Sequence, residues 1–432
     1  MAAEAPRTWK VQAMEAREKE KILSSIQKKL EDIYMAITKD SSGTSELERE
    51  KKKAKLKEER AGLMRELSRV ASEIKTPDCS GMSEAERAEE AERLRQEAME
   101  EARRLELEGD HDGSLKKQNR ARIMDLDPKQ GGVYFNRMSF SVSPTFDIDE
   151  ESPLGPMRFT YKVYENGETP EVCEAVNILS VKIACSDVGF PIQVYGSVIA
   201  RDSIDHKCVY LFRRDRDHCQ LITSKLQLPS FPAVNSGLHH LYFGDEALIL
   251  TGPKRGLALL DDSYVETDLK IKDHQGQDRE LSKGVLTIRG IAGRSLEKCE
   301  VERKSIATRL STVDVMYAVV KNAVEGTIAI RVLQGDFYGT ITAHTTSIQK
   351  RIVLYDSKVA GAETPDDHGV IQLMRPVVSV YVRDMLIIDT KTSAGKSARL
   401  EFAPKGNSGE RVVVTLGATK VRVRIAWSIM DP

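Results

Sequence analysis

The chain has 432 residues, more than one ordinary hydrophobic core holds, so two or three domains are expected. Its net charge of −1 provides no overall field that would attract nucleic acids or membranes. No apolar run reaches the length of a membrane-spanning helix, and the first ten residues lack the apolar stretch of a signal peptide. A cytoplasmic or nuclear location without a membrane partner is therefore predicted.

Charged residues are distributed unevenly along the chain. Residues 1–126 contain 27 Lys/Arg and 28 Asp/Glu, whereas the other 306 residues contain 38 of each kind. The six cysteines lie far apart, without a closely spaced pair, which favours free thiols over a disulfide framework. This composition predicts a charged N-terminal arm (residues 1–109) followed by a different kind of domain.

The arm has the apolar spacing of α-helices. Apolar residues recur three, four or seven positions apart, at Ile22, Ile26, Leu30, Ile33 and Ile37 and again at Leu56, Leu63, Leu67, Val70 and Ile74. Ser45 with Glu48, and Ser83 with Glu86, have the spacing of a helical capping box. Helices are therefore predicted at about 9–39, 45–75 and 83–108, the first two forming a hairpin or coiled coil.

The apolar seams of these helices are narrow, which predicts that the arm self-associates into a homo-oligomer or docks a protein partner. The lysine-rich run 51–57 is flanked by glutamates at pairing distance and is interpreted as a solvated helix face. The balanced charge of the arm argues against nucleic acid as a partner.

Residues 110–132 are polar and contain Gly113 and Pro128, which predicts a linker. From residue 133 to 432, apolar and polar residues alternate in short runs separated by turn-forming residues, as in 313–317, 328–332 and 421–425. No helical pattern intervenes. The predicted fold class is α+β by segregation, with a helical arm and an all-β module.

The β module shows internal similarity. Tyr195-Gly-Ser-Val-Ile-Ala200 is echoed by Tyr338-Gly-Thr-Ile-Thr-Ala343, and each is followed by a polar turn and an apolar run. Two quasi-repeats are predicted at about 178–290 and 312–428, each with the size of a β-sandwich or barrel. Val198 and Ile341, and likewise Leu250 and Leu373, are the expected equivalent core positions.

Several motifs of the β module resemble a family of cereal-grass proteins built on a domain of unknown function. The similar segments, which span about 150–430, are 152–160, 195–204, 250–256, 264–270, 345–348 and 426–428. The family carries no assigned activity and no functional residues that the resemblance would transfer. Some of its members are grouped with ribosome-inactivating enzymes, so the resemblance implies a role in plant defence or stress.

Two sequence features are candidate binding sites. An apolar insertion in the first repeat serves either as a recognition loop or as a lid on the core, and its residues are Phe231, Leu238, His239, His240, Leu241 and Tyr242. Lys254 and Arg255, next to Pro253, form either an anion-binding turn or a simple turn between strands.

No nucleophile elbow, nucleotide-binding loop or zinc-protease helix occurs in the sequence, so no catalytic, metal or cofactor residues are predicted. His218, Cys219 and Cys208 match no standard zinc spacing. The leading hypothesis is a non-enzymatic interaction protein. The alternative is an enzyme with its active site in the β module, such as an rRNA N-glycosidase or another hydrolase.

Overall fold

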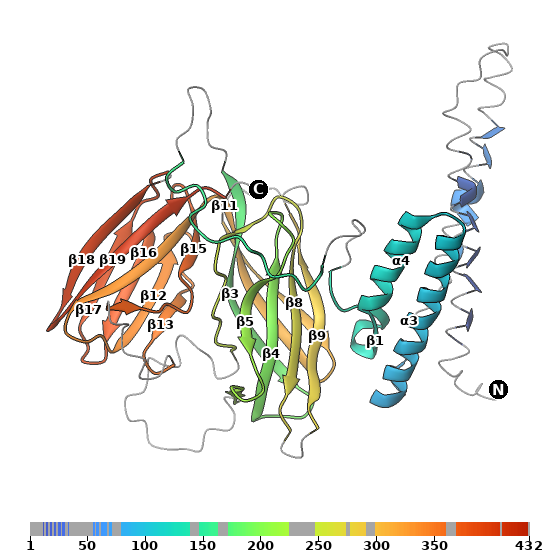
Figure 1. Cartoon of the computed structure of the whole chain (residues 1–432), viewed down its shortest axis with the longest axis horizontal. Helices are drawn as coiled ribbons and strands as arrows, with labels where there is room; N and C mark the ends of the chain where they lie inside the picture. The colour runs from blue at the N-terminus through green and yellow to red at the C-terminus, as the bar shows by residue number, and fades with distance from the viewer. Residues whose placement is uncertain are drawn as a thin grey trace, which may run out of the picture. The chain divides into compact units, whose positions relative to one another are not determined.

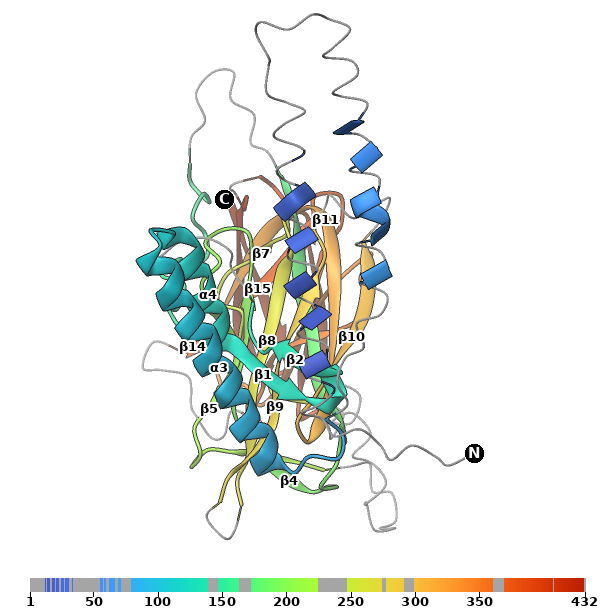
Figure 2. The same ribbon diagram turned by 90° about the vertical axis from the view of Figure 1, so that its right-hand side faces the viewer.

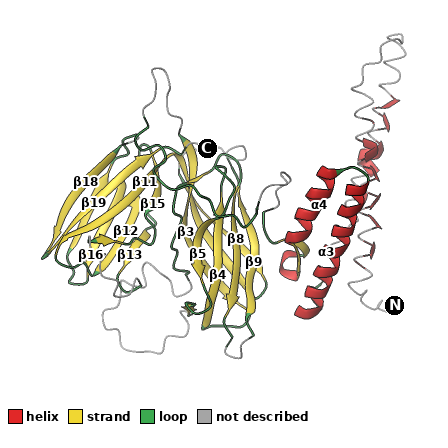
Figure 3. Cartoon of the chain, viewed as in Figure 1, coloured by secondary structure: helices red, strands yellow, loops and turns green. Residues whose placement is uncertain are grey.

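The computed structural model describes residues 79–138, 147–162, 172–223, 247–273, 277–290, 299–359, 369–406 and 408–430, together with single residues between Gln12 and Val70. Helices occupy the N-terminal part and strands the C-terminal part (Figure 3). The predicted fold class is therefore confirmed. The chain divides into two compact units, residues 1–110 with 124–134, and residues 111–123 with 135–432.

The described residues of the first unit include helices and a short hairpin. All described residues between Gln12 and Val70 are helical, and the predicted break near residues 39–45 lies outside the described residues. Helix α3 (Glu84–Leu107) begins with the predicted capping box. The Ser83 hydroxyl accepts a hydrogen bond from the Glu86 amide, while the Glu86 carboxylate accepts one from the Ser83 amide.

A small core holds α3 against the hairpin strand β1 (Met124–Asp127). Ala91 on α3 packs with Cys79 and with Leu126 of β1, and all three are buried. Arg95 Nε donates to the Met124 carbonyl at 2.9 Å. Figures 1 and 2 both show β1 beside α3.

The predicted linker is wrong, because regular elements occupy it. Helix α4 (His111–Ile123) is followed by β1, a 3₁₀ helix (Pro128–Gln130) and β2 (Gly132–Phe135). Asp112 in the first turn and Arg120 in the last turn complement the helix dipole, and Lys116 pairs with Asp112 at 2.6 Å. Pro128 begins a helical turn, a position that proline favours.

The second unit contains two β lobes. Lobe A consists of β3 (Cys173–Ser186), β4 (Ile192–Arg201), β5 (Val209–Arg214), β6 (Gln220–Ile222), β7 (Leu257–Ala258), β8 (Ser263–Ile271), β9 (Arg279–Ile288), β10 (Glu300–Thr308) and the first half of β11 (Ser311–Gln334). Lobe B consists of the second half of β11 and β12 (Gly339–Thr345), β13 (Ile352–Asp356), β14 (Val370–Ile371), β15 (Val377–Tyr381), β16 (Leu386–Thr392), β17 (Ser397–Phe402), β18 (Gly409–Leu416) and β19 (Thr419–Ser428).

The described strands of this unit form three sheets, all with antiparallel pairing between neighbouring strands. One sheet has the order β18-β19-β11-β3-β7, with β10, β14 and β15 also paired to β11. A second has the order β5-β4-β8-β9, with β6 paired to β4, and a third has the order β13-β12-β16-β17. None of these sheets closes into a barrel within the described residues. Each lobe is therefore a sandwich of one half of the large sheet and one smaller sheet (Figure 1).

Strand β11 belongs to both lobes. Its first half pairs with β3 and β10 and its second half with β14, β15 and β19. Figure 2 shows β10 along β11. At 24 residues, β11 is far longer than an ordinary strand. Asn322, where the pairing changes, has a φ of +41°, in the left-handed region that asparagine tolerates.

Each lobe has its own hydrophobic core. Val198 and Leu250 are buried in lobe A, as predicted. Ile341 is buried in lobe B, and Leu373 is half-buried beside that core. The predicted recognition loop or lid, residues 231 and 238–242, lies outside the described residues.

Polar contacts fasten the two lobes together. The Asn177 side chain on β3 donates to the Ser379 carbonyl at 2.7 Å and accepts from the Ser379 amide at 2.9 Å. Arg375 donates to the carbonyls of Ile178 and Leu179, and burial lowers the pKa of Arg375 to about 10. Because these groups are buried, their mutual pairing fixes the position of one lobe against the other.

Candidate functional site

A polar cavity of about 110 Å³ lies on the outer face of the β5-β4-β8-β9 sheet. Val198 points into the core of lobe A, so its neighbours Ser197 and Ile199 point to the opposite side. Ile199 stands opposite Glu266 of β8. The polar residues that line the cavity include Arg137, Asp149, Cys208, Tyr210, Glu266, Asp268 and Lys283.

Glu266 is a buried carboxylate between two arginines. Arg201 Nε lies 2.8 Å from one carboxylate oxygen and Arg137 Nε lies 2.8 Å from the other. The Met138 amide also donates to this carboxylate, at 2.9 Å. Burial acts to raise the pKa of Glu266, but the hydrogen bond and charge of Arg201, with the charge of Arg137, outweigh it and lower the pKa.

The same arginines hold the segment that precedes β3, residues 147–160, which we call the strap. Both Arg201 Nη2, at 2.5 Å, and Arg137 Nη2, at 3.1 Å, donate to the Ile148 carbonyl. Cys208 and Glu150 add a backbone hydrogen bond of 2.9 Å. The buried ion pairs therefore attach the strap to lobe A.

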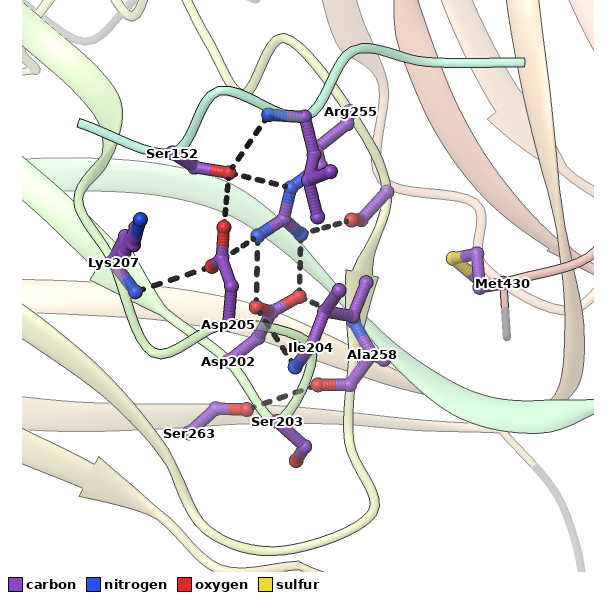
Figure 4. Close-up of polar contacts among 12 residues, drawn as sticks. Ser152, Asp202, Ser203, Ile204, Asp205, Lys207, Arg255, Ala258, Ser263 and Met430 are labelled. Atoms are coloured by element: carbon purple, nitrogen blue, oxygen red, sulfur yellow. Dashed lines mark hydrogen bonds and ion pairs between the residues drawn. The ribbon is translucent and has the colours of Figure 1, made fainter. Parts of the chain in front are cut away.

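A second buried cluster surrounds Arg255 (Figure 4). Its guanidinium binds both carboxylate oxygens of Asp202, at 2.6 and 3.0 Å, and one oxygen of Asp205 at 3.0 Å. Ser152 of the strap donates to Asp205 at 2.6 Å and lies 3.3 Å from Arg255 Nε. The bidentate geometry explains why an arginine occupies this position.

Of the two alternatives predicted for Lys254 and Arg255, this cluster favours the simple turn over the anion-binding turn. Arg255 is only 2% exposed, and the chain's own aspartates already bind its guanidinium. Lys254 is exposed and pairs with Glu151 of the strap at 3.1 Å. An external anion would have to displace these carboxylates, so the turn does not present a free pair of cations.

Glu325 on β11 connects the strap to lobe B. Its carboxylate accepts hydrogen bonds from the amides of Gly256 and Met157, each at 2.7 Å, and from the Thr327 hydroxyl. Burial raises the pKa of Glu325. A Cβ on Gly256 would lie 2.4 Å from the Met430 sulfur, so a larger residue at this position would displace the Met430 side chain.

These groups do not form a catalytic arrangement. Burial raises the pKa of the Cys208 thiol, which keeps it protonated and weakly nucleophilic at neutral pH. His344 Nδ1 lies 3.7 Å from Asp389, and burial lowers the pKa of His344. Within the described residues, no hydroxyl or thiol is hydrogen-bonded to His344 that it would activate.

The residues considered for zinc have other partners. His218 Nδ1 contacts Asp215 at 2.8 Å, and the Cys219 thiol lies 3.3 Å from the Gln193 side chain. Across the described part of the chain, no three His, Cys, Asp or Glu side chains gather in a way that would hold a metal ion. None of the described helices is long and apolar enough to span a membrane.

The fold and these clusters define a two-lobed β-sandwich module whose buried charges are paired internally. The profile of the family described as "Domain of unknown function (DUF6598)" matches residues 175–425. The chain belongs to this family. The matched region begins in β3 and ends in β19, so it includes both lobes.

No curated protein matches the chain. Among solved structures, human GIVD cytosolic phospholipase A2 is 9% identical with a TM-score of 0.21, covering 61% of this chain and 31% of that chain. Its complex with methyl gamma-linolenyl fluorophosphonate is 10% identical with a TM-score of 0.21, covering 61% and 33%. The chain thus spans about a third of the phospholipase's length, and a similarity of this size carries no argument about fold or function.

Proposed function

We propose that the chain is a non-enzymatic interaction protein, in which the β module recognises a ligand and the helical arm self-associates or docks a partner. The observation that carries this proposal is the internal pairing of the buried charges. Glu266 is neutralised by Arg137 and Arg201, and Arg255 by Asp202 and Asp205. These groups stabilise the fold and are not available for chemistry.

The enzyme alternative needs a group with a pKa matched to proton transfer or an activated nucleophile. The pKa of Glu266 is lowered, away from the value a general acid requires at neutral pH. Glu325 has a raised pKa, but it lies beneath the strap and its oxygens accept hydrogen bonds from two amides. Both carboxylates therefore support a structural role.

The arm supplies the second binding element of the proposal. Its seam residues Ile26, Ile33 and Val70 are buried, whereas Ile22 and Met64 remain about half exposed on helical segments. Exposed apolar residues of this kind offer a contact surface to a second helix.

We further infer that the two lobes are internal repeats. The order β5-β4-β8-β9 corresponds to β13-β12-β16-β17, strand for strand along the chain. Gly196 and Gly339, each preceded by tyrosine, have φ values of +111° and +156°. A Cβ would lie 2.2 Å from the Asp268 carbonyl oxygen at the first glycine and 2.0 Å from that of Lys391 at the second. The same close approach thus recurs at corresponding positions.

A turnover assay tests the proposal against its enzyme alternative. The full-length protein is incubated with intact ribosomes, and released adenine is measured beside a known ribosome-inactivating enzyme. We expect no release above background. Catalytic depurination by the wild-type protein would contradict the proposal.

A further inference from the structure

The large sheet presents a face of lobe B that is rich in cations. On β19, Val423 points into the core, so the residues on either side of it point outward. Arg411 of β18 stands opposite Arg424, and Arg331 of β11 stands opposite Arg422. The resulting basic face consists of Arg331, Arg411, Lys420, Arg422 and Arg424 on three adjacent strands.

None of these five cations has an acidic partner within the described residues. Arg424 donates to the Tyr161 hydroxyl at 2.8 Å, and Arg422 is half-buried while the other four are exposed. In contrast, the arginines that hold the strap, Arg137, Arg201 and Arg255, each have a carboxylate partner. Five such cations in a chain of net charge −1 form a pronounced local field.

The large sheet has a corresponding face in lobe A, on β10 and the first half of β11, and there the charges are paired. The β10–β11 hairpin of lobe A corresponds to the β18–β19 hairpin of lobe B. When the last pair before each turn is matched, Thr308–Ser311 with Leu416–Thr419, Arg303 corresponds to Arg411 and Asp314 to Arg422. In lobe A, Arg303 pairs with Asp314, and the Ser305 hydroxyl donates to Asp314 at 2.6 Å.

Lobe B has an arginine, Arg422, at the position of that aspartate, and Val413 at the position of Ser305. Like charges on neighbouring strands oppose the pairing of those strands. The fold does not need this arrangement, because lobe A forms the same hairpin with a neutralised pair. The basic face therefore indicates an external anion.

We propose that this face binds single-stranded nucleic acid, an inference that rests on the proposed recognition function and names its ligand class. Lys420, Arg422 and Arg424 alternate along β19 and so lie about 6.6 Å apart, comparable with the repeat of an extended polynucleotide backbone. Four of the five cations are arginines, whose planar fork matches phosphate oxygens.

An exposed aromatic residue lies beside these cations. Tyr161 is 69% exposed, and its hydroxyl is held by Arg424, which leaves the ring open for a base to stack on. Arg158 and Lys162 lie over the neighbouring Phe159 ring, at 5.0 and 5.3 Å from its centroid. The balanced charge of the whole chain argued against nucleic acid, but the cations of the basic face, which have no acidic partner within the described residues, favour it.

Fluorescence anisotropy on the full-length protein tests this inference, with short labelled single-stranded RNA and DNA at low and physiological salt. Arg422→Asp recreates the lobe A pair with Arg411 and should weaken binding about tenfold, reducing the salt slope by about 0.7 for each phosphate that is no longer bound. Arg424→Gln, a milder change at an exposed position, should weaken binding in the same direction. Lys350→Asp, an exposed cation elsewhere in lobe B, should leave binding unchanged.

Several outcomes would overturn the inference. Absence of wild-type binding at low salt, or equal affinities for all variants, would show that the face does not bind nucleic acid. Preferential binding of phosphatidylserine vesicles or polyglutamate would reassign the face to a membrane or an acidic protein, while the recognition function stands. Breakdown of the oligonucleotide by the wild-type protein would instead contradict the proposed non-enzymatic function.

Discussion

At the scale of single residues, the buried paired charges are brought together from distant parts of the sequence. Arg201 and Glu266 are separated by 65 positions, and Arg255 meets Asp202 across 53. No periodicity predicts such a pair, because the partners meet only after the sheet has formed. The sequence therefore predicted a turn at Arg255 but not the buried partners of its side chain.

At this scale we expect Glu266→Gln to be strongly destabilising. The variant leaves Arg137 and Arg201 without a counter-charge, which should reduce the free energy of unfolding by about 3 kcal/mol or more at neutral pH. Glu401→Gln removes an exposed partner of Arg399 and should cost less than about 0.5 kcal/mol. Chemical denaturation of the three proteins measures both effects.

The difference in unfolding free energy between wild type and Glu266→Gln should depend on pH, because the pKa of Glu266 is lowered in the folded protein. A carboxylate with a folded pKa below its unfolded value stabilises the protein above the unfolded pKa, near 4.3, and loses this contribution as pH falls through the folded pKa. The difference between wild type and Glu266→Gln should therefore be constant near neutrality and shrink below about pH 4. A difference that does not change with pH would contradict the assignment.

Among the elements, regular local patterns were predicted best. The capping box predicted Ser83 as the residue that caps α3, and the helix begins at the next residue, Glu84. The alternation of apolar and polar residues predicted the strands of the β module. Helix α4 was missed because Gly113 and the polar composition outweighed the favourable charges at its two ends. The double role of β11 was also missed, because Lys321, Asn322 and Glu325 interrupt the apolar pattern and made 313–317 and 328–332 look like two separate strands.

The arm helices carry a prediction of their own. Because Ile22 and Met64 are exposed on helical segments, we expect the full-length chain to elute as at least a dimer in size-exclusion chromatography with light scattering. The double variant Ile22→Glu with Met64→Glu should lower the mass to that of a monomer. Lys29→Glu, an exposed polar position of the arm, serves as the control. A monomeric wild-type protein would exclude self-association through the arm.

As a whole molecule, the β unit combines two similar sandwiches that differ in their surface charge. Lobe A neutralises Arg303 with Asp314 on the outer face of the large sheet, whereas lobe B carries five cations there that have no acidic partner in the described part of the chain. Both lobes share β11, and the strap contacts lobe A through Glu150 and lobe B through Glu325. Paired charges thus have a structural role in this unit, and we assign recognition to the basic face.

Hydrogen exchange on the full-length protein, with and without single-stranded RNA, tests most directly whether the basic face is the recognition surface. Exchange reports how strongly each backbone amide is protected, so it locates the bound surface along the chain. We predict that RNA slows exchange in β18 and β19, residues 409–428, and leaves β10 and the first half of β11, residues 300–320, unchanged. Equal slowing in both hairpins, or slowing confined to the strands around the polar cavity, would contradict it.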